Sequence, residues 1–241
     1  MSFLLEKLKM SELHWLDHLL IFILVLGLPL NSFVQGKQQF LNRVNWSSGD
    51  KIKFYWTNAA ALWMLFAAVV LNWWITGKDL HYLITNFHSP QWSILALILV
   101  LIIISAYFLE LFWSTHPNLD KIATIERLHQ QTPFLPSCKR EWHHYIALAV
   151  TAGICEEVVF RFYLLSYFIQ LTNQIIFGLI LSSIIFGIVH LYQGYKAMVK
   201  IGILSFLFGW LFLLTESLLI PIILHIFIDL VSGRMAYRLL R

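Results

Sequence analysis

Charged side chains are scarce in this chain of 241 residues: Asp, Glu, Lys and Arg make up 12%, whereas hydrophobic residues make up 59%. Soluble globular domains carry about 25% charged residues. A chain with about half of that share has too little polar surface to coat a soluble particle. The composition therefore excludes a soluble domain. It predicts an integral, all-α membrane protein, because helices satisfy their own backbone hydrogen bonds in lipid.

Cysteine is nearly absent, and the usual signatures of metal, redox and nucleic-acid proteins are missing too. The two cysteines, Cys138 and Cys155, have no metal-binding or redox spacing, and no HExxH motif occurs. The net charge is +4, but Lys and Arg lie between the apolar runs and form no basic, aromatic-interleaved face. We therefore expect no cofactor, no resident metal and no nucleic-acid partner.

Long apolar runs are abundant, and a run of about 20 residues can cross a bilayer. No small-x-small cleavage site follows the first run, so we interpret it as a membrane helix and not as a signal peptide. The longest polar connection, residues 114–141, separates N-terminal helices of unassigned role (1–135) from a C-terminal helical core (136–241). The runs predict a polytopic transmembrane bundle of about seven spans, at residues 17–35, 54–76, 92–113, 143–169, 174–191, 197–214 and 217–238.

The distribution of Lys and Arg predicts the orientation of the bundle. Thirteen of these residues lie in the connections 36–53, 114–141 and 192–200 and at the C-terminal end, against three on the other side. Cytoplasmic loops carry the excess of Lys and Arg. We expect the N-terminus outside, the C-terminus inside, and a bacterial inner membrane as the host bilayer.

The fourth apolar run contains charges that are costly in a membrane. Glu156, Glu157 and Arg161 stand within six residues, and each charge at mid-membrane costs about 2.5–3.5 kcal/mol on insertion scales. Glu157 and Arg161 are four positions apart, so they share a helix face and can pair. Glu156 is about 100° away around an ideal helix and lacks this partner. Its carboxylate is therefore a candidate general base.

Two further apolar runs each carry buried polar groups. Phe186 and His190 are four positions apart in one run, where Gly187 allows close helix approach, and His225 and Asp229 are four apart in another. Each polar group is costly unless it faces a shared cavity. Together with Glu156 they form the inventory of a water-activating active site within the membrane. Pro221, one turn before His225, is expected to loosen the backbone there.

The order EExxxR, FxxxH and HxxxN/D, each on a membrane helix, resembles the motifs of the CPBP intramembrane proteases. That family includes the CAAX prenyl proteases and the bacteriocin-processing or Abi proteins. The resemblance covers about residues 140–232, and the motifs stand here as Glu156-Glu157…Arg161, Phe186…His190 and His225…Asp229.

The resemblance implies a glutamate-dependent endopeptidase that cuts a membrane-associated or lipidated peptide or protein. On that pattern Glu156 and His190 activate a water, and His225 and the residue at position 229 bind the oxyanion. The ion pair beside Glu156 would support it.

Two residues depart from the family pattern. Many members have Gly directly after the Arg, where this chain has Phe162, so local packing must differ. Position 229 is Asp, where the CAAX branch favours Asn. An ionised carboxylate would oppose an oxyanion, so Asp229 must be protonated or must orient His225 by accepting its N–H; we favour the second.

Three other functions use the same residues. Two histidines and a glutamate could hold a catalytic zinc. The chain could instead bind a membrane peptide without cutting it, as an immunity or scaffold protein would. Intramembrane Glu and His also build proton relays in transporters, although no inverted repeat is visible. Taken singly, the ion pair and each His could also be structural contacts between helices.

Overall fold

The computed structural model describes residues 12–34, 46–78, 87–88, 90–114 and 132–239, and within them every regular element is a helix. This confirms the predicted all-α fold. The first helical run, Trp15–Val34, contains α2 (Trp15–Phe22) and the π-helical η1 (Ile23–Gly27). The remaining elements are α4 (Ser48–Ile75), α6 (Ile94–Ser114), α8 (Lys139–Glu157), the π-helical η2 (Val158–Leu164), α9 (Leu165–Thr172), α10 (Ile175–Val189), the short 3₁₀ turn η3 (Leu191–Gln193), α11 (Tyr195–Thr215) and α12 (Leu219–Leu239).

Each of the seven predicted spans overlaps one helical run of the structure. Four runs are long and apolar enough to cross a membrane: Trp15–Val34, Ser48–Ile75, Tyr195–Thr215 and Leu219–Arg238. Two shorter apolar helices cover Ile94–Leu109 and Ile175–Val189. The seventh run is the continuous path α8–η2–α9, which carries the charged motif. The chain is therefore a helical integral membrane protein.

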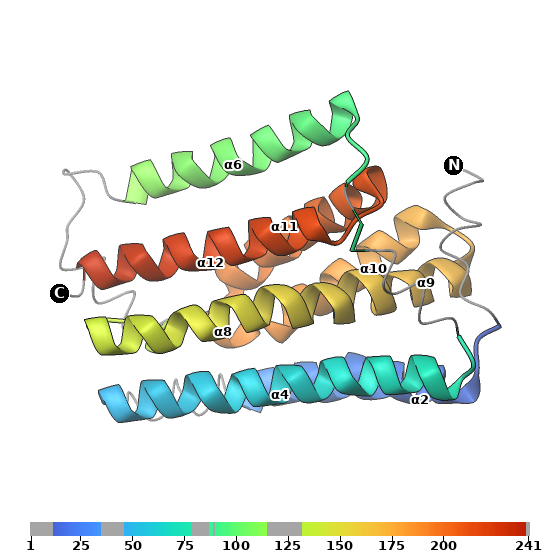
Figure 1. Cartoon of the computed structure of the whole chain (residues 1–241), viewed down its shortest axis with the longest axis horizontal. Helices are drawn as coiled ribbons and strands as arrows, with labels where there is room; N and C mark the ends of the chain where they lie inside the picture. The colour runs from blue at the N-terminus through green and yellow to red at the C-terminus, as the bar shows by residue number, and fades with distance from the viewer. Residues whose placement is uncertain (1–11, 35–45, 79–86, 89, 115–131, 240–241) are drawn as a thin grey trace.

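The helices lie side by side along the long dimension of the molecule (Figure 1). In this view α2 and α4 form one side, α6 lies at the opposite side, and α8 and α12 lie between them. α4 packs along α8, α8 packs along α12, and α10 packs along α11. The three helices that carry the predicted motifs, α8, α10 and α12, are thus brought together by the bundle.

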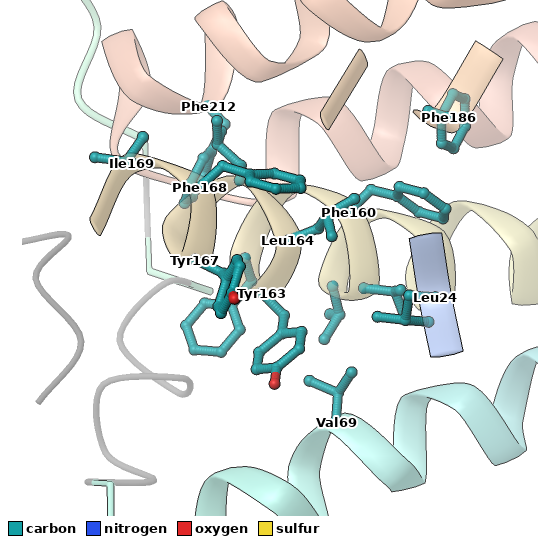
Figure 2. Packing of buried hydrophobic residues seen from close by; sticks show 14 of the residues in the cluster. Leu24, Val69, Phe160, Tyr163, Leu164, Tyr167, Phe168, Ile169, Phe186 and Phe212 are labelled. Atoms are coloured by element: carbon teal, nitrogen blue, oxygen red, sulfur yellow. The ribbon is translucent and has the colours of Figure 1, made fainter. Parts of the chain in front are cut away.

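The path α8–η2–α9 is the centre of the core. Every residue from 157 to 169 is buried, although the run contains charged groups. Figure 2 shows how side chains leave this path in different directions: Tyr163 points toward α4 and its Val69, while Phe160 points toward Phe186. Phe160 and Phe186 meet edge to face, with ring centroids 4.7 Å apart. Because neighbours cover the path on several sides, its polar groups can contact only protein or an internal cavity.

The N-terminal ends of α4 and α8 are joined by a buried ion pair. Lys51 Nζ lies 3.3 Å from Glu141 Oε2 and donates to the Leu135 carbonyl at 2.9 Å. Burial raises the pKa of Glu141, but hydrogen bonds from Ser137 and Ser48 and the charge of Lys51 outweigh it and lower the pKa to about 2. The carboxylate is therefore ionised at neutral pH, and the contact fixes the two helices at the same level.

The prediction that Pro221 loosens the backbone before His225 is wrong. α12 begins at Leu219, so Pro221 lies in its first turn. Backbone N–H groups of a first turn have no partner within the helix, and Pro therefore removes no hydrogen bond there.

The predicted close approach at Gly187 is confirmed. A Cβ added to Gly187 would lie 2.9 Å from the Met198 carbonyl oxygen and 3.2 Å from the Cα of Gly202. These are backbone atoms of α11, which cannot turn away as a side chain can. The missing side chain therefore sets the spacing of α10 and α11.

We predict that Gly187→Ala destabilises the protein by about 1–3 kcal/mol, because α10 must move away from α11. Gly202→Ala is the matched control from the facing helix, since its Cβ would meet nothing closer than 3.5 Å. Denaturant unfolding of the purified protein in detergent measures both variants. Equal stability of the two would contradict the assigned role of Gly187.

Candidate active site

A cavity of about 470 Å³ lies among the helices, and five of the six predicted site residues line it. The five come from four elements: α8, η2, α12 and the end of α10. N-terminal helices build another part of the wall, with Leu28 and Asn31 from the first helical run and Asn58, Ala61 and Leu65 from α4. The part of the chain that the sequence left without a role therefore completes the cavity. The lining site residues are Glu156, Arg161, His190, His225 and Asp229.

The Glu156 side chain lines this cavity. Its Oε2 is buried and has no hydrogen-bond partner within the part of the chain that is described. His225 Nε2 is the nearest cation-forming atom, at 3.9 Å. Ala152 and Ala149 lie one and two turns before Glu156 on α8 and also line the cavity. Their small side chains leave open space beside Glu156. The structure thus agrees with the expectation from helical geometry that Arg161 pairs with Glu157 and not with Glu156.

Glu157 lies behind the cavity wall and joins two other site residues. It is fully buried. One oxygen, Oε1, lies 2.7 Å from His225 Nδ1, and the other, Oε2, lies 3.0 Å from Arg161 Nε. The contact with Arg161 is an ion pair whose angle is not that of a hydrogen bond, so both atoms remain without a hydrogen-bond partner among the described residues. The predicted pair therefore exists, and it also includes His225.

Arg161 sits on the π-helical segment η2, next to two aromatic faces. Its guanidinium carbon lies 4.5 Å from the centre of the Phe186 ring and 5.6 Å from that of Phe208. The rings stabilise the cation in an apolar setting. Arg161 Nη1 is buried and has no hydrogen-bond partner within the described residues, although the residue lines the cavity. π-Helical turns occur often at functional sites because they change which side chains face a site.

His190 follows the last residue of α10, and its ring orientation is fixed by its own helix. Nδ1 lies 2.8 Å from the Phe186 carbonyl oxygen. A carbonyl only accepts, so Nδ1 carries the proton, and in the neutral ring Nε2 is an acceptor. The ring is further held against Phe186, with centroids 4.7 Å apart. No hydrogen bond joins His190 to Glu156 in the described residues, so their shared feature is the cavity that both line.

The expected orientation of His225 by Asp229 is corrected by the structure. Asp229 Oδ2 lies 3.7 Å from His225 Nε2, which is beyond hydrogen-bond distance, whereas Glu157 binds Nδ1 at 2.7 Å. Glu157 therefore fixes the ring. The reason is the packing of α8 against α12, where Gly153 lets Ile226 approach closely. This contact between helices was not visible in the spacing of the motif.

The unusual Phe162 is explained by the N-terminal helices. It is fully buried, and its ring centroid lies 4.7 Å from that of Trp73 on α4. A large residue at this position fills the space between η2 and α4. Phe162, which departs from the family pattern, therefore packs against α4.

Tyr192 is a cavity residue that sequence reasoning missed. It lies on η3, stacks on the His190 ring at 6.1 Å, and its hydroxyl accepts a hydrogen bond from Gln193 Nε2 at 2.9 Å. Burial raises the pKa of Tyr192, as do the charges of Glu156 and Asp229, although the Gln193 bond opposes the shift. The phenol therefore keeps its proton at neutral pH. A Tyr two positions after a motif His has no spacing signal by which it could have been found.

No group of three or more His, Cys, Asp or Glu residues in the described part of the chain is arranged as a metal site. The zinc hypothesis therefore has no support from side-chain geometry, and its test is chemical.

The fold and the cavity define a class: a helical membrane protein in which titratable side chains from three motif helices meet around one internal space. Residues 139–231 match the family model described as type II CAAX prenyl endopeptidase Rce1-like. The match confirms the resemblance of this segment to the CAAX proteases, and that similarity implies a hydrolase of the protease type. Comparisons with curated proteins and with solved structures found no match.

The adjacent glutamates should respond differently to neutralisation. Glu156→Gln is expected to leave the free energy of unfolding unchanged or to raise it, because its buried Oε2 has no hydrogen bond to the described residues and lies 3.9 Å from His225 Nε2. Glu157→Gln is expected to lower it by about 3–5 kcal/mol, because Arg161 becomes an uncompensated buried charge. Denaturant unfolding in detergent gives both values. Equal losses in the two variants would contradict the assigned pairing.

Proposed function

We propose that this protein is an intramembrane endopeptidase in which Glu156 acts as the general base. The observation that carries the proposal is the Glu156 carboxylate, which lines the cavity: its buried Oε2 has no hydrogen bond to the described residues and lies 3.9 Å from His225 Nε2. A carboxylate needed only for folding would be paired, as Glu157 is. An unpaired one beside two histidines suits the abstraction of a proton from water.

In the first step Glu156 removes a proton from a water molecule while the water oxygen attacks the scissile carbonyl carbon. His190 Nε2 is the free acceptor of its ring and would hold the second hydrogen of this water. The carbonyl oxygen becomes an oxyanion, and a tetrahedral intermediate forms. In the second step the C–N bond breaks, and Glu156 returns the proton to the leaving amine. One peptide bond and one water thus become a carboxyl group and an amine.

His225 is proposed to stabilise the oxyanion. Its Nδ1 donates to Glu157, so Nε2 is the ring atom that faces the cavity. A donor at Nε2 requires the doubly protonated ring, and the Glu157 carboxylate, 2.7 Å from Nδ1, compensates that charge. The Arg161 cation adds to the positive potential at the cavity wall.

The substrate we propose is a membrane-associated or lipidated peptide or protein. The cavity is lined by apolar residues of α4 and α8 and reaches Thr132, Tyr192, Gln193 and Lys200. These residues lie in or beside connections that carry the excess of Lys and Arg, which predicts access from the inner face of the membrane. An apolar wall with a polar end suits a chain that is held in the bilayer and cut near its surface.

Cleavage of a fluorogenic library of lipidated and membrane-anchored peptides by the purified protein tests the proposal. We expect Glu156→Gln and His190→Ala each to lower kcat/KM by about 10²–10⁴-fold, because each removes a group that handles the proton of water. Glu216→Gln is the matched control, since Glu216 lies outside the cavity in the turn after α11. The proposal fails if both variants cut as well as the wild type.

The same assay with a strong chelator separates the zinc hypothesis. We expect wild-type cleavage to be unaffected, whereas complete loss that added Zn²⁺ restores would assign the reaction to a metal. A wild-type protein that binds peptides and cuts none would favour the binding or immunity function. Proton-dependent uptake into vesicles would favour a transporter.

We further propose a bacterial inner-membrane protein with its N-terminus outside and its C-terminus inside. A fluorescent protein fused after residue 241 should fluoresce, because it folds only on the cytoplasmic side, and alkaline phosphatase at the same site should be inactive. The opposite pattern is expected for fusions in the connection after Lys78. Active phosphatase at the C-terminus would contradict the orientation.

A further inference from the structure

A second buried polar cluster lies away from the cavity, and its centre is Asp17. Oδ1 accepts hydrogen bonds from Asn72 Nδ2 at 2.7 Å and from the Tyr163 hydroxyl at 3.1 Å. Oδ2 accepts from Lys78 Nζ at 2.6 Å and from the His14 backbone N–H at 2.9 Å. We call these five residues the Asp17 cluster. One carboxylate thus gathers donors from α2, α4, the end of the turn after α4, and η2.

Four residues of the cluster are buried, and the exposed His14 contributes only its backbone N–H. Asp17 is 0% exposed, Lys78 5% and Tyr163 0%. Asn72 Nδ2 also lies 3.0 Å from the Tyr163 hydroxyl, and Lys78 Nζ donates to Thr76 Oγ1 at 2.8 Å. Neither Asp17 nor Tyr163 lines the cavity. The cluster therefore does not bind substrate, and its connection with the site must run through the helix that both share.

Tyr163 and Arg161 are two positions apart on η2, which places them on roughly opposite faces of a helix. The contacts agree: Arg161 lies on rings of α10 and α11, while Tyr163 binds Asp17 of α2 and Asn72 of α4. Figure 2 shows the Tyr163 side chain pointing away from Phe186 and toward α4. The cluster therefore binds one face of η2 through Tyr163, while Arg161 projects from the other face into the site.

Stability alone does not account for this cluster. Replacing a buried ion pair by apolar residues of similar size is often neutral or stabilising, so a buried Lys and Asp in a membrane helix bundle are an expensive way to hold helices together. Directional hydrogen bonds fix the register and the rotation of one helix relative to its neighbours, which apolar packing does not. η2 needs such fixing, because a π-helix is less favourable than an α-helix and is found mostly as single turns.

We infer that the Asp17 cluster positions η2 through Tyr163, and thereby holds Arg161 at Glu157 and Glu157 at His225. Asp17, Asn72, Lys78 and Tyr163 are then positioning residues, and the N-terminal helices contribute to the site by more than the cavity wall. The effect on the reaction rests on the proposed endopeptidase function, whereas the effect on η2 does not.

Tyr163→Phe tests the inference because it removes one oxygen and keeps the ring. Tyr167→Phe is the matched control: Tyr167 is one turn further along on α9 and likewise binds the first helical run, through His18 Nδ1 at 2.7 Å. We expect Tyr163→Phe to lower kcat about tenfold or more with KM nearly unchanged, because site groups move while substrate contacts stay. Tyr167→Phe is expected to change kcat by less than about twofold.

Hydrogen–deuterium exchange of the same proteins gives a readout that needs no substrate. Tyr163→Phe should accelerate exchange of the amides of residues 158–164 and leave those of residues 48–70 on α4 unchanged. Unchanged exchange in 158–164 overturns the inference, and so does an equal loss of kcat in both Tyr variants. A wild-type protein that cuts no peptide defeats the proposed function alone, since the exchange result still decides whether the cluster holds η2.

Discussion

The structure depends on a single carboxylate, that of Glu157, which is shared between Arg161 and His225. Three charged residues within six positions would exclude this run from a membrane if each stood alone. Glu157 binds Arg161, four positions further along its own helical path, and His225 of α12. The carboxylate that compensates the charge of Arg161 therefore also joins two helices. Its partners face the cavity while Glu157 lies behind it, which leaves Glu156 free.

The N-terminal helices serve the site in ways that involve no motif. α4 and the first helical run line the cavity together with the motif helices, and Trp73 packs against Phe162, where many members of the family have glycine. The same two elements reach η2 from behind through Asp17 and Asn72. The family segment, residues 139–231, is therefore only one part of the unit that builds the site. The rest is supplied by helices whose sequence is constrained by packing and burial.

Much of the candidate site could be inferred from the sequence because charge in a membrane is rare and its spacing is informative. The separation of four between Glu157 and Arg161 predicts a pair, and the structure has one. The same rule places His225 and Asp229 on one face, and the structure has them there, 3.7 Å apart, in an ion contact that is too long for a hydrogen bond. Helical spacing states which residues can meet. It does not state whether a residue of a neighbouring helix competes for the same nitrogen, and here Glu157 does.

By itself the sequence determined the membrane location, the positions of the seven helical runs and the identity of the unpaired glutamate, because these follow from composition, run length and helical periodicity. Only the tertiary structure decided which carboxylate orients His225, that Tyr192 lies beside His190, and that Asp17 collects three donors from distant parts of the chain. These contacts depend on how far helices approach and rotate about one another. That is set by small residues such as Gly153 and Gly187 at interfaces, and a local pattern does not encode the partner that a small residue admits.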